Sequence, residues 1–365
     1  MANTPPRRGF GVVFEKAGCQ RLDTPILQPA DVFLDRSGDA IRRRLYMLTD
    51  PAGREFCLRP ELTIPLARAV IAAGLAEARV WSEGRIFRYG GDGNGEFLQA
   101  GIEFIGGKNI AADDAEVFAL IDEACGVGDA RTVRLGDLGI LQAVLNAVDL
   151  PDNWRARLRR HFWHADVFAD LLARLKGDAK PMDDENAGLL ASVASLSPVE
   201  ATRAVHDILK LANIKPVGGR SVAEITARFL EKAQDAKQDV IAPDVALALE
   251  AFLGVEVSAD IAVDELGKLA KQFKLDLDPA LEQLGLRHDA LASRGLALSE
   301  TTFATAFGRE IEYYTGFVFE MQLGNRKIAG GGRYDGLMEQ LGAKHPLTAV
   351  GGAIWPGRLS KGGAS

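Results

Sequence analysis

The sequence predicts an α+β protein in which an antiparallel sheet with flanking helices is interrupted by a mostly helical region. Three observations predict this. Short strand-like runs joined by turn signals occupy residues 1–149. Residues 150–292 are rich in Ala, Leu, Asp and Lys and follow helical periodicity. Strand-like texture returns over residues 293–365, so we expect the two ends to form the first and second parts of one core.

The overall composition is that of a globular protein. A length of 365 residues exceeds the size at which one hydrophobic core usually stops growing, so two packed regions are expected. Hydrophobic residues make up 47% of the chain and charged residues 25%, which argues against disorder. The net charge of -7 has the wrong sign for a protein that must cover many phosphates, so we expect no stable nucleic-acid binding.

The three cysteines, Cys19, Cys57 and Cys125, are too few and too scattered for a disulfide framework. We expect them to be small buried side chains in a protein of a reducing compartment. No apolar run approaches the roughly 18 residues that a membrane span requires. The sequence therefore predicts a cytoplasmic protein without a membrane segment.

In the first part of the core, turn signals alternate with apolar runs. The turn at residues 50–53 predicts a hairpin between residues 46–48 and 56–58. Helical spacing follows over residues 64–78. Two longer strands are expected at residues 80–88 and 97–106, bridged by the glycine-rich residues 90–95.

The second of these long strands carries two polar residues, Gln99 and Glu103, on one face, because successive side chains of a strand alternate. This pattern has two interpretations, a ligand-binding face or a solvated face, and the alternation alone does not separate them. The acidic run at residues 113–116 then predicts the first turn of a helix that continues to about Ala124.

In the middle region, Pro198 and Pro243 mark the starts of two helices. His161 and His164 lie three residues apart, a spacing that puts them on one helical face, but no further ligands stand at suitable spacing and we expect no metal. Strand texture resumes at residues 312–321. Asn325 supports a turn into residues 326–329, followed by a helix at residues 337–341 and a strand at residues 349–354.

Four arginines lie in or beside the predicted core strands: Arg59, Arg88, Arg309 and Arg333. A guanidinium group is costly to bury without a carboxylate or an anionic ligand. Salt bridges within the sheet would account for Arg59 and Arg333, with Glu61, Glu103, Glu312 and Asp335 as the available partners. A pocket for a zwitterion would need cations and anions together, and this set of residues supplies both.

These motifs, in this order, resemble the catalytic core of histidyl-tRNA synthetase, a class II aminoacyl-tRNA synthetase. The resemblance covers roughly residues 10–130 and 300–360 and rests on the segments at residues 58–63, 86–88, 99–103, 308–316 and 330–337. It implies a class II synthetase-like antiparallel sheet and a pocket for histidine. The residues that it places in this pocket are Glu61, Thr63, Arg88, Gln99, Glu103, Arg309, Tyr313, Tyr314 and Tyr334. In this pocket Arg309 would face the ligand's carboxylate, Glu61 and Gln99 its ammonium group, and Glu103 its ring.

The chain also departs from the synthetase pattern. The loop of the second motif, residues 89–96, carries no cation, so triphosphate binding would be poorly supported. The third motif is altered at residues 355–359, where Arg358 is the one candidate for its arginine. The chain ends 28 residues after Leu337, and we expect no anticodon-binding domain.

A synthetase-like core with these departures resembles the regulatory subunits of ATP phosphoribosyltransferase. The resemblance implies a non-catalytic protein of histidine biosynthesis, without cofactor or metal, that partners the short-form catalytic subunit. It also implies activation of that subunit, feedback inhibition by L-histidine, and a hetero-octamer built on dimers of this chain. Whether histidine acts from the synthetase-like pocket or from a subunit interface stays open. Two alternatives are an amino-acid-activating enzyme with a non-tRNA acceptor and a stand-alone histidine sensor.

Overall fold

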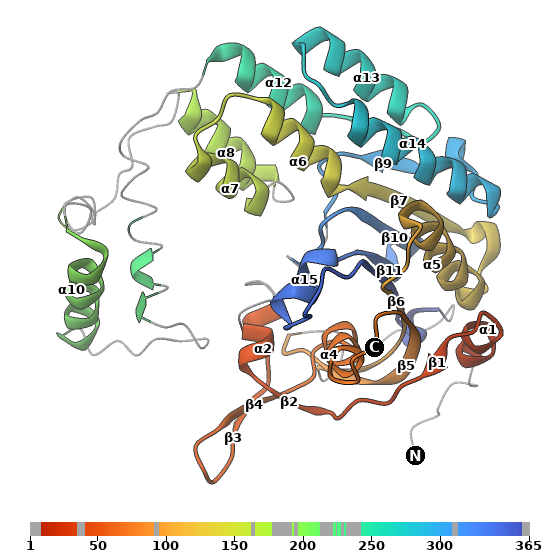
Figure 1. Ribbon diagram of the computed structural model, residues 1–365, viewed down its shortest axis with the longest axis horizontal. Helices are drawn as coiled ribbons and strands as arrows, with labels where there is room; N and C mark the ends of the chain where they lie inside the picture. The colour runs from red at the N-terminus through yellow and green to blue at the C-terminus, as the bar shows by residue number, and fades with distance from the viewer. Residues whose placement is uncertain are drawn as a thin grey trace. The chain divides into compact units, whose positions relative to one another are not determined.

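The computed structural model describes residues 9–34, 41–90, 95–161, 165–176, 192, 196–211, 222–223, 225–227, 230, 242–308 and 313–359. The chain divides into two compact units. One comprises Met1–Trp163 and Ala248–Ser365, and the other comprises His164–Leu247. All strands of the described residues belong to the first unit (Figure 1).

A nine-stranded sheet with the strand order β1-β5-β6-β12-β11-β10-β7-β9-β8 forms the centre of the first unit. Neighbouring strands are antiparallel except for the pairs β1 with β5 and β7 with β9. A second sheet has the order β2-β4-β3. The strands are β1 Gln20–Arg21, β2 Leu27–Pro29, β3 Met47–Thr49, β4 Glu55–Leu58, β5 Ala78–Phe87, β6 Glu96–Ile105, β7 Arg131–Asp137, β8 Glu256–Ser258, β9 Thr302–Ala304, β10 Phe317–Leu323, β11 Arg326–Arg333 and β12 Ala349–Ile354.

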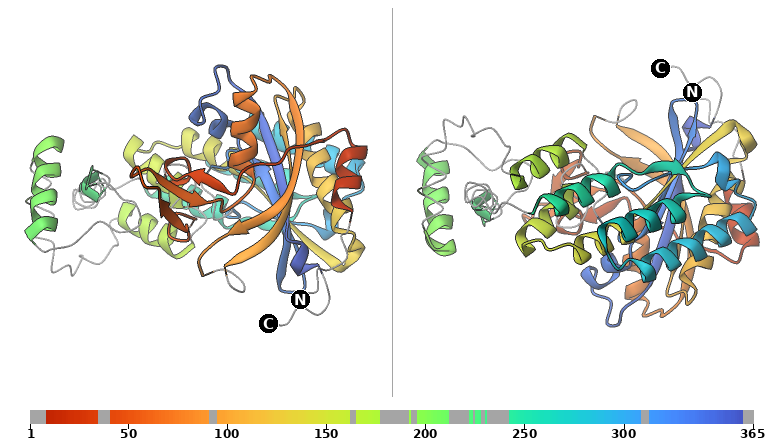
Figure 2. Two further views of the ribbon diagram at one scale, coloured as in Figure 1. Left: turned by 90° about the horizontal axis from the view of Figure 1, so that it is seen from below. Right: turned by 90° about the horizontal axis from the view of Figure 1, so that it is seen from above.

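The helices of the first unit lie around this sheet. They are α1 Phe10–Lys16, α2 Asp31–Leu34, α4 Thr63–Ala72, α5 Ile110–Cys125, α6 Leu138–Ala147, α7 Asp152–His161, α13 Ala262–Phe273, α14 Asp278–Ser293 and α15 Asp335–Gln340. Figure 2 shows β5 and β6 as two long, curved strands beside the shorter central ones. The predicted antiparallel sheet with flanking helices is confirmed.

Alternation along the strands gives the sheet two different faces. On one face Phe319 of β10 packs edge-on against Phe118 of α5, with ring centroids 5.2 Å apart. Helix α14 packs against the outer side of α5. On the opposite face Val80 and Val318 join a buried core with Leu66 of α4 and Leu337 of α15. This second face also carries the polar side chains of the candidate site.

The second unit is helical where the structure describes it. It contains α8 Ala165–Leu175, α10 Pro198–Leu211 and the start of α12 Pro243–Leu253. The helix starts predicted at Pro198 and Pro243 are confirmed. At the start of α10 the Ser197 backbone N–H donates to the Glu200 carboxylate at 3.0 Å, and the Glu200 backbone N–H donates to the Ser197 hydroxyl at 3.4 Å. This reciprocal arrangement is a capping box, which explains why the helix begins there.

Three predicted boundaries are wrong by a few residues. The helix expected over residues 64–78 ends at Ala72, because Gly74 adopts a left-handed φ of 68° and β5 begins at Ala78. The strand expected from residue 312 begins at Phe317. The helix expected from Leu337 begins at Asp335 and ends at Gln340. The hairpins and the last strand are confirmed, whereas the domain boundaries at residues 149 and 292 stay predictions.

The three cysteines are buried and form no disulfide within the described part of the chain, as expected for small apolar side chains. Within the described ranges, no helix is long and apolar enough to cross a membrane. His164, the second histidine of the proposed helical pair, lies outside the described residues.

Candidate functional site

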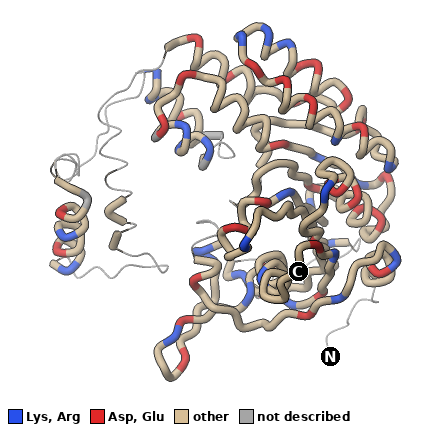
Figure 3. Tube along the Cα trace, viewed as in Figure 1, with Lys and Arg blue, Asp and Glu red and all other residues tan. Residues whose placement is uncertain are grey.

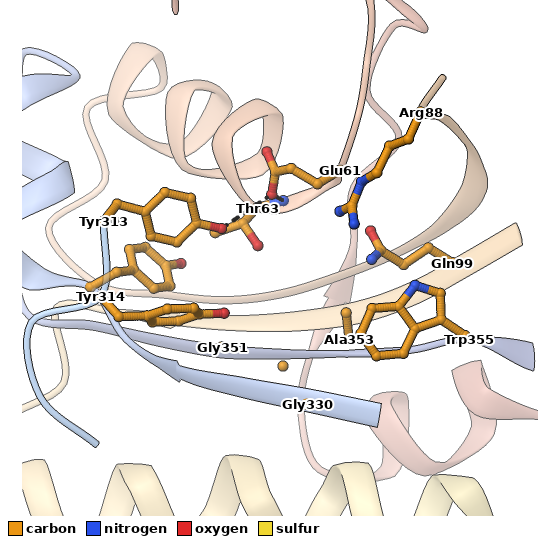
Figure 4. Close-up of a pocket in the computed structure, with 12 residues that line it drawn as sticks. Glu61, Thr63, Arg88, Gln99, Tyr313, Tyr314, Gly330, Gly351, Ala353 and Trp355 are labelled. Atoms are coloured by element: carbon orange, nitrogen blue, oxygen red, sulfur yellow. Dashed lines mark hydrogen bonds between the residues drawn. The ribbon is translucent and has the colours of Figure 1, made fainter. Parts of the chain in front are cut away.

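A pocket opens on the sheet face that carries Gln99, between the start of α4 and strands β6, β11 and β12 (Figure 4). Its free space is about 340 Å³, open solvent included. The lining residues are Glu61, Thr63, Arg88, Gln99, Tyr313, Tyr314, Gly330, Tyr334, Gly351, Gly352, Ala353 and Trp355.

Glu61 lies just before α4 and is only 3% exposed. Its carboxylate accepts hydrogen bonds from the backbone N–H of Thr63 at 2.7 Å and of Ile64 at 2.9 Å. Burial raises the pKa of Glu61, against these two N–H donors and the nearby charge of Arg88, which lower it. The first-turn amides of α4 therefore hold this carboxylate in place at the pocket wall.

Glu103 of β6 lies beside the pocket rather than in its lining and is 2% exposed. The Tyr334 hydroxyl donates to its Oε2 at 2.5 Å. Burial raises the pKa of Glu103 to about 8, although hydrogen bonds from Thr63 and Tyr334 act in the opposite direction. Gly351 lies opposite Glu103 in the β12–β6 register, and a Cβ at Gly351 would overlap the Glu103 carboxylate. The glycine therefore makes the space in which this carboxyl group is buried.

Arg88 and Gln99 line the other end of the pocket. Arg88 Nε donates to the Pro60 carbonyl at 2.7 Å, and its guanidinium group lies over the Phe97 ring, 5.8 Å from the centroid. Figure 4 shows Arg88, Gln99 and Trp355 on one side of the pocket and the tyrosines on the other. Gln99 is 3% exposed, so the solvated interpretation of the Gln99 and Glu103 face is wrong.

Three tyrosines form the opposite wall. The Tyr313 ring lies 5.1 Å from that of Tyr314 and 5.7 Å from that of Tyr334, centroid to centroid. The Tyr313 hydroxyl is 3.4 Å from Glu61 Oε2 and donates toward it. The tyrosine wall and the polar end together give the pocket one aromatic end and one charged end.

The floor of the pocket is made of small residues that sequence reasoning did not identify. Gly330 of β11 lies opposite Ala353 of β12, and Gly351 and Gly352 also belong to the lining. The sequence shows the glycines at residues 330–332 and 351–352, but that they meet is visible only in the structure, where Gly331 pairs with Gly352 and Gly332 with Gly351. Trp355 was noted only for the altered third motif, yet it also lines the pocket.

The buried arginines are paired in two different ways. Arg333 donates to Asp335 at 3.0 Å and to Asp114 at 2.6 Å, so its predicted salt bridge is confirmed with an additional partner on α5. Arg59 does not follow the salt-bridge prediction. Its guanidinium group donates to the carbonyls of Arg85 at 2.9 Å and Thr24 at 2.5 Å, and Gly84 leaves the room for it. Backbone carbonyls take the place of the expected carboxylate.

Asp114 is shared with a second arginine from a distant part of the chain. Arg287 of α14 donates to Asp114 at 2.7 Å and also pairs with Asp137, which caps α6 by accepting from the Gly139 N–H at 2.7 Å. Asp114 and both arginines are at most 4% exposed. This buried network of Asp114, Asp137, Arg287 and Arg333 joins α5, α6 and α14 to the end of β11, next to Tyr334.

The pocket thus brings together seven of the nine residues that the resemblance placed there: Glu61, Thr63, Arg88, Gln99, Tyr313, Tyr314 and Tyr334. Glu103 adjoins the pocket through Tyr334, and Arg309 lies outside the described residues. The role of all nine in holding a ligand stays a prediction.

Carboxylates, an arginine and aromatic side chains, rather than a cluster of metal ligands, are what the described residues bring to this site. Among the described residues, no group of three or more His, Cys, Asp or Glu side chains could hold a metal ion. Figure 3 shows acidic and basic residues interspersed along α10 and α13.

Comparisons with known proteins agree with this geometry. A family model described as histidyl-tRNA synthetase matches residues 6–210 and 203–359. A solved structure from Bacillus halodurans, described as an ATP phosphoribosyltransferase regulatory subunit/histidyl-tRNA synthetase, has a TM-score of 0.63 at 21% identity and covers 94% of this chain and 74% of that one. A solved structure of a histidine–tRNA ligase subunit from Alicyclobacillus acidocaldarius has a TM-score of 0.58 at 26% identity. The match covers 98% of this chain and 94% of that one.

The fold and the pocket therefore define a protein of the class II aminoacyl-tRNA synthetase type. Among curated relatives, the ATP phosphoribosyltransferase regulatory subunit of Brucella anthropi is 37% identical over 349 residues, covering 93% of this chain and 92% of that protein. The protein of the same name from Mesorhizobium japonicum is 35% identical over 354 residues. This match covers 95% of this chain and 94% of that protein. The chain belongs to this histidyl-tRNA synthetase-like family of ATP phosphoribosyltransferase regulatory subunits.

Proposed function

We propose that the chain is the non-catalytic regulatory subunit of a short-form ATP phosphoribosyltransferase in the cytoplasm. It activates the catalytic subunit at the first step of histidine biosynthesis and carries the feedback response to L-histidine. The observation that carries the proposal is the pocket itself, which combines a carboxylate, a cation and an aromatic wall, in a chain related to proteins of that name.

The charges at the polar end suit a zwitterion. Glu61 and Gln99 face the ligand's ammonium group, while Arg88 and, outside the described residues, Arg309 face its carboxylate. With the charged groups at this end, the ligand's side chain extends toward the tyrosine wall and the Glu103–Tyr334 pair. Opposite charges in a partly dehydrated pocket supply both affinity and orientation.

The alternative, an amino-acid-activating enzyme with a non-tRNA acceptor, needs a nucleotide site as well. Of the described residues that line the pocket, Arg88 is the one cation. Arg358, the candidate arginine of the third motif, donates to the Lys327 carbonyl at 3.1 Å and stacks on Trp355 at 5.1 Å, and it does not belong to the lining. A triphosphate needs several positive groups for its charge, which favours the non-catalytic proposal.

The proposed partners are the short-form catalytic subunit, L-histidine as effector, and other copies of this chain as dimers within a hetero-octamer. The proposal places the inhibitory histidine in the pocket rather than at a subunit interface. Its effect on the partner would then be a coupling free energy, typically about 1–3 kcal/mol for such systems.

The test is the rate of phosphoribosyl-ATP formation from ATP and phosphoribosyl pyrophosphate by the catalytic subunit of the same source. The rate is measured with and without this chain over a histidine titration. We expect activation that histidine reverses. Absence of activation, together with histidine-dependent ATP–pyrophosphate exchange by this chain alone, would favour the enzyme alternative.

Variants separate the pocket from an interface. Arg88→Ala should activate the catalytic subunit and require at least tenfold more histidine for inhibition. Arg85→Ala is a matched control three residues away, because Arg85 is exposed and pairs with Glu96, which does not line the pocket. A normal histidine response in both Arg88→Ala and Arg309→Ala would place the effector site elsewhere.

A further inference from the structure

Two carboxyl groups are buried at this site, and they receive different hydrogen-bond donors. Glu61 accepts from two backbone amides at the start of α4 and also has the hydroxyls of Tyr313 and Thr63 as partners. Among the described residues Glu103 has hydroxyl partners alone, those of Tyr334 and Thr63. Within the described part of the chain, no Lys, Arg or His forms an ion pair with Glu103, and the charge of Arg88 acts on Glu61.

The other described elements packed around Glu103 add no positive charge. Strand β12 contributes Gly351 and β5 contributes Val80 in register with it. The segment before β10 contributes the Tyr313 phenol, and the segment before α4 contributes the like charge of Glu61. Among the described residues Arg88 is the one cation whose charge acts on this pair. Two buried carboxylates with one such cation cannot both stay ionised cheaply, so the pair retains a proton near neutral pH.

The donors decide where this proton resides. Backbone amides at a helix start and a neighbouring arginine stabilise the charged form of Glu61, whereas hydroxyl groups can donate or accept and so also suit a neutral acid. Tyr334 Oη and Glu103 Oε2 are 2.5 Å apart, a short contact that either atom can make as donor. The direction of this hydrogen bond therefore follows the protonation of Glu103.

We propose that Glu103 is a neutral carboxylic acid in the ligand-free protein at neutral pH. Its protonation state then determines whether the Tyr334 hydroxyl can donate a hydrogen bond to a ligand in the pocket or only accept one. When Glu103 carries the proton it donates to Tyr334 Oη, and the Tyr334 hydroxyl is released to donate to the ligand. When Glu103 is ionised, the Tyr334 hydroxyl must donate to it and offers the ligand only an acceptor.

The consequence is that pH determines which hydrogen bond Tyr334 can form with the side chain of the ligand. In the protonated state the Tyr334 hydroxyl can donate to an unprotonated ring nitrogen of the ligand, and in the ionised state it can only accept from a ring N–H, which weakens binding of a ligand that presents the unprotonated nitrogen. This part rests on the proposed function, because it takes L-histidine as the ligand. The protonation of Glu103 itself does not depend on which ligand binds, so the two statements fail separately.

The first experiment is infrared difference spectroscopy of the ligand-free protein from pH 6 to pH 10. Wild type should show the C=O stretch of a protonated carboxylic acid at pH 7 that is lost as pH rises through about 8, the pKa of Glu103. Glu103→Gln should lack this band. If wild type and Glu103→Gln have the same spectrum in this region at pH 7, the proposal is wrong.

Tyr334→Phe provides a second variant in case Glu103→Gln folds poorly. The Tyr334 hydroxyl favours the charged form of Glu103. Its removal should therefore move the loss of the C=O band to higher pH. A band lost at the wild-type pH would overturn the proposed Tyr334–Glu103 link.

The second experiment is calorimetric titration with L-histidine at pH 7 and pH 9. An amide at position 103 can donate to Tyr334 Oη permanently, so Glu103→Gln should keep near-wild-type affinity at pH 7. Between pH 7 and pH 9 wild type should lose about tenfold more affinity than the variant, as expected for one group that titrates near pH 8. The ligand's own amino group titrates equally in both proteins, so the ratio of the two affinity losses reports the titration of Glu103.

Equal affinity losses in the two proteins would contradict the proposal. An infrared band without histidine binding at either pH would refute the proposed function alone.

Discussion

Glu103 is the single residue at which burial alters the chemistry most, and it makes the stability of the protein depend on pH. Its pKa rises from 4.5 to about 8 on folding, so between these values the folded state binds the extra proton. The stabilising contribution is fully present below pH 4.5 and is lost as pH rises through 8. Each unit of pKa shift corresponds to about 1.4 kcal/mol of unfolding free energy. The coupling of Glu103 to Glu61 reduces the sum of this contribution.

Glu103→Gln should therefore unfold with a free energy that falls less steeply from pH 5 to pH 8 than that of wild type. At pH 9 the variant should be the more stable protein by roughly 1 kcal/mol or more. Urea denaturation at pH 5, 7 and 9 measures the difference. A constant offset between the two proteins across this range would mean that Glu103 does not change protonation.

Gly351 is the residue whose lack of a side chain the site requires. A Cβ there would overlap Glu103 Oε2 and crowd the Ile102 carbonyl. Gly351→Ala should cost about 1–3 kcal/mol of unfolding free energy, as overpacking does, and should weaken histidine binding because Glu103 must move. Gly357→Ala is the control, since nothing lies within 4 Å of a Cβ at Gly357. Equal melting temperatures for the two variants would show that the sheet accommodates the added methyl group.

At the scale of elements, α14 is tied to the sheet by the buried network. Arg287 pairs with Asp114 and Asp137 with only 4% of its surface exposed. Arg287→Ala leaves two buried carboxylates without this partner and should cost about 3–5 kcal/mol. Arg294 of the region just after α14 pairs with Glu116 at the surface, where it is 40% exposed, so Arg294→Ala should cost less than about 1 kcal/mol. Similar denaturation midpoints for the two variants would contradict a structural role of the network.

The elements also show what the sequence could and could not predict. Gln99 and Glu103 share a face because strand alternation is a local rule, so their common orientation was predictable. Their burial was not, since it depends on β12 and on α4 packing over that face. Asp114 was visible only as part of an acidic helix start. Its pairing with Arg287 joins residues 173 positions apart, a contact that no local pattern contains.

The start of α10 was predictable from a local sequence signal, and the end of α4 also had such a signal, which the apolar spacing obscured. The Ser197–Glu200 capping box explains why the start of α10 was read correctly. The end of α4 was placed too late because apolar spacing continued to Leu75, although Gly74 carried the stop signal. The site itself was largely predictable because the motifs that line it belong to a recognisable family, whereas its glycine floor depends on the pairing of β11 with β12.

At the scale of the whole molecule, the described pocket belongs to the compact unit made of Met1–Trp163 and Ala248–Ser365. A ligand that binds only the folded state stabilises it by mass action, about 2.7 kcal/mol at a concentration of 100 Kd. Hydrogen exchange of the full chain with and without saturating L-histidine should show slower exchange in β6, β11, β12 and the first turn of α4. Exchange in α10, which belongs to the other unit, should be unchanged and serves as the internal control. Protection confined to α10, or equal in both units, would place the ligand or its effect outside the pocket.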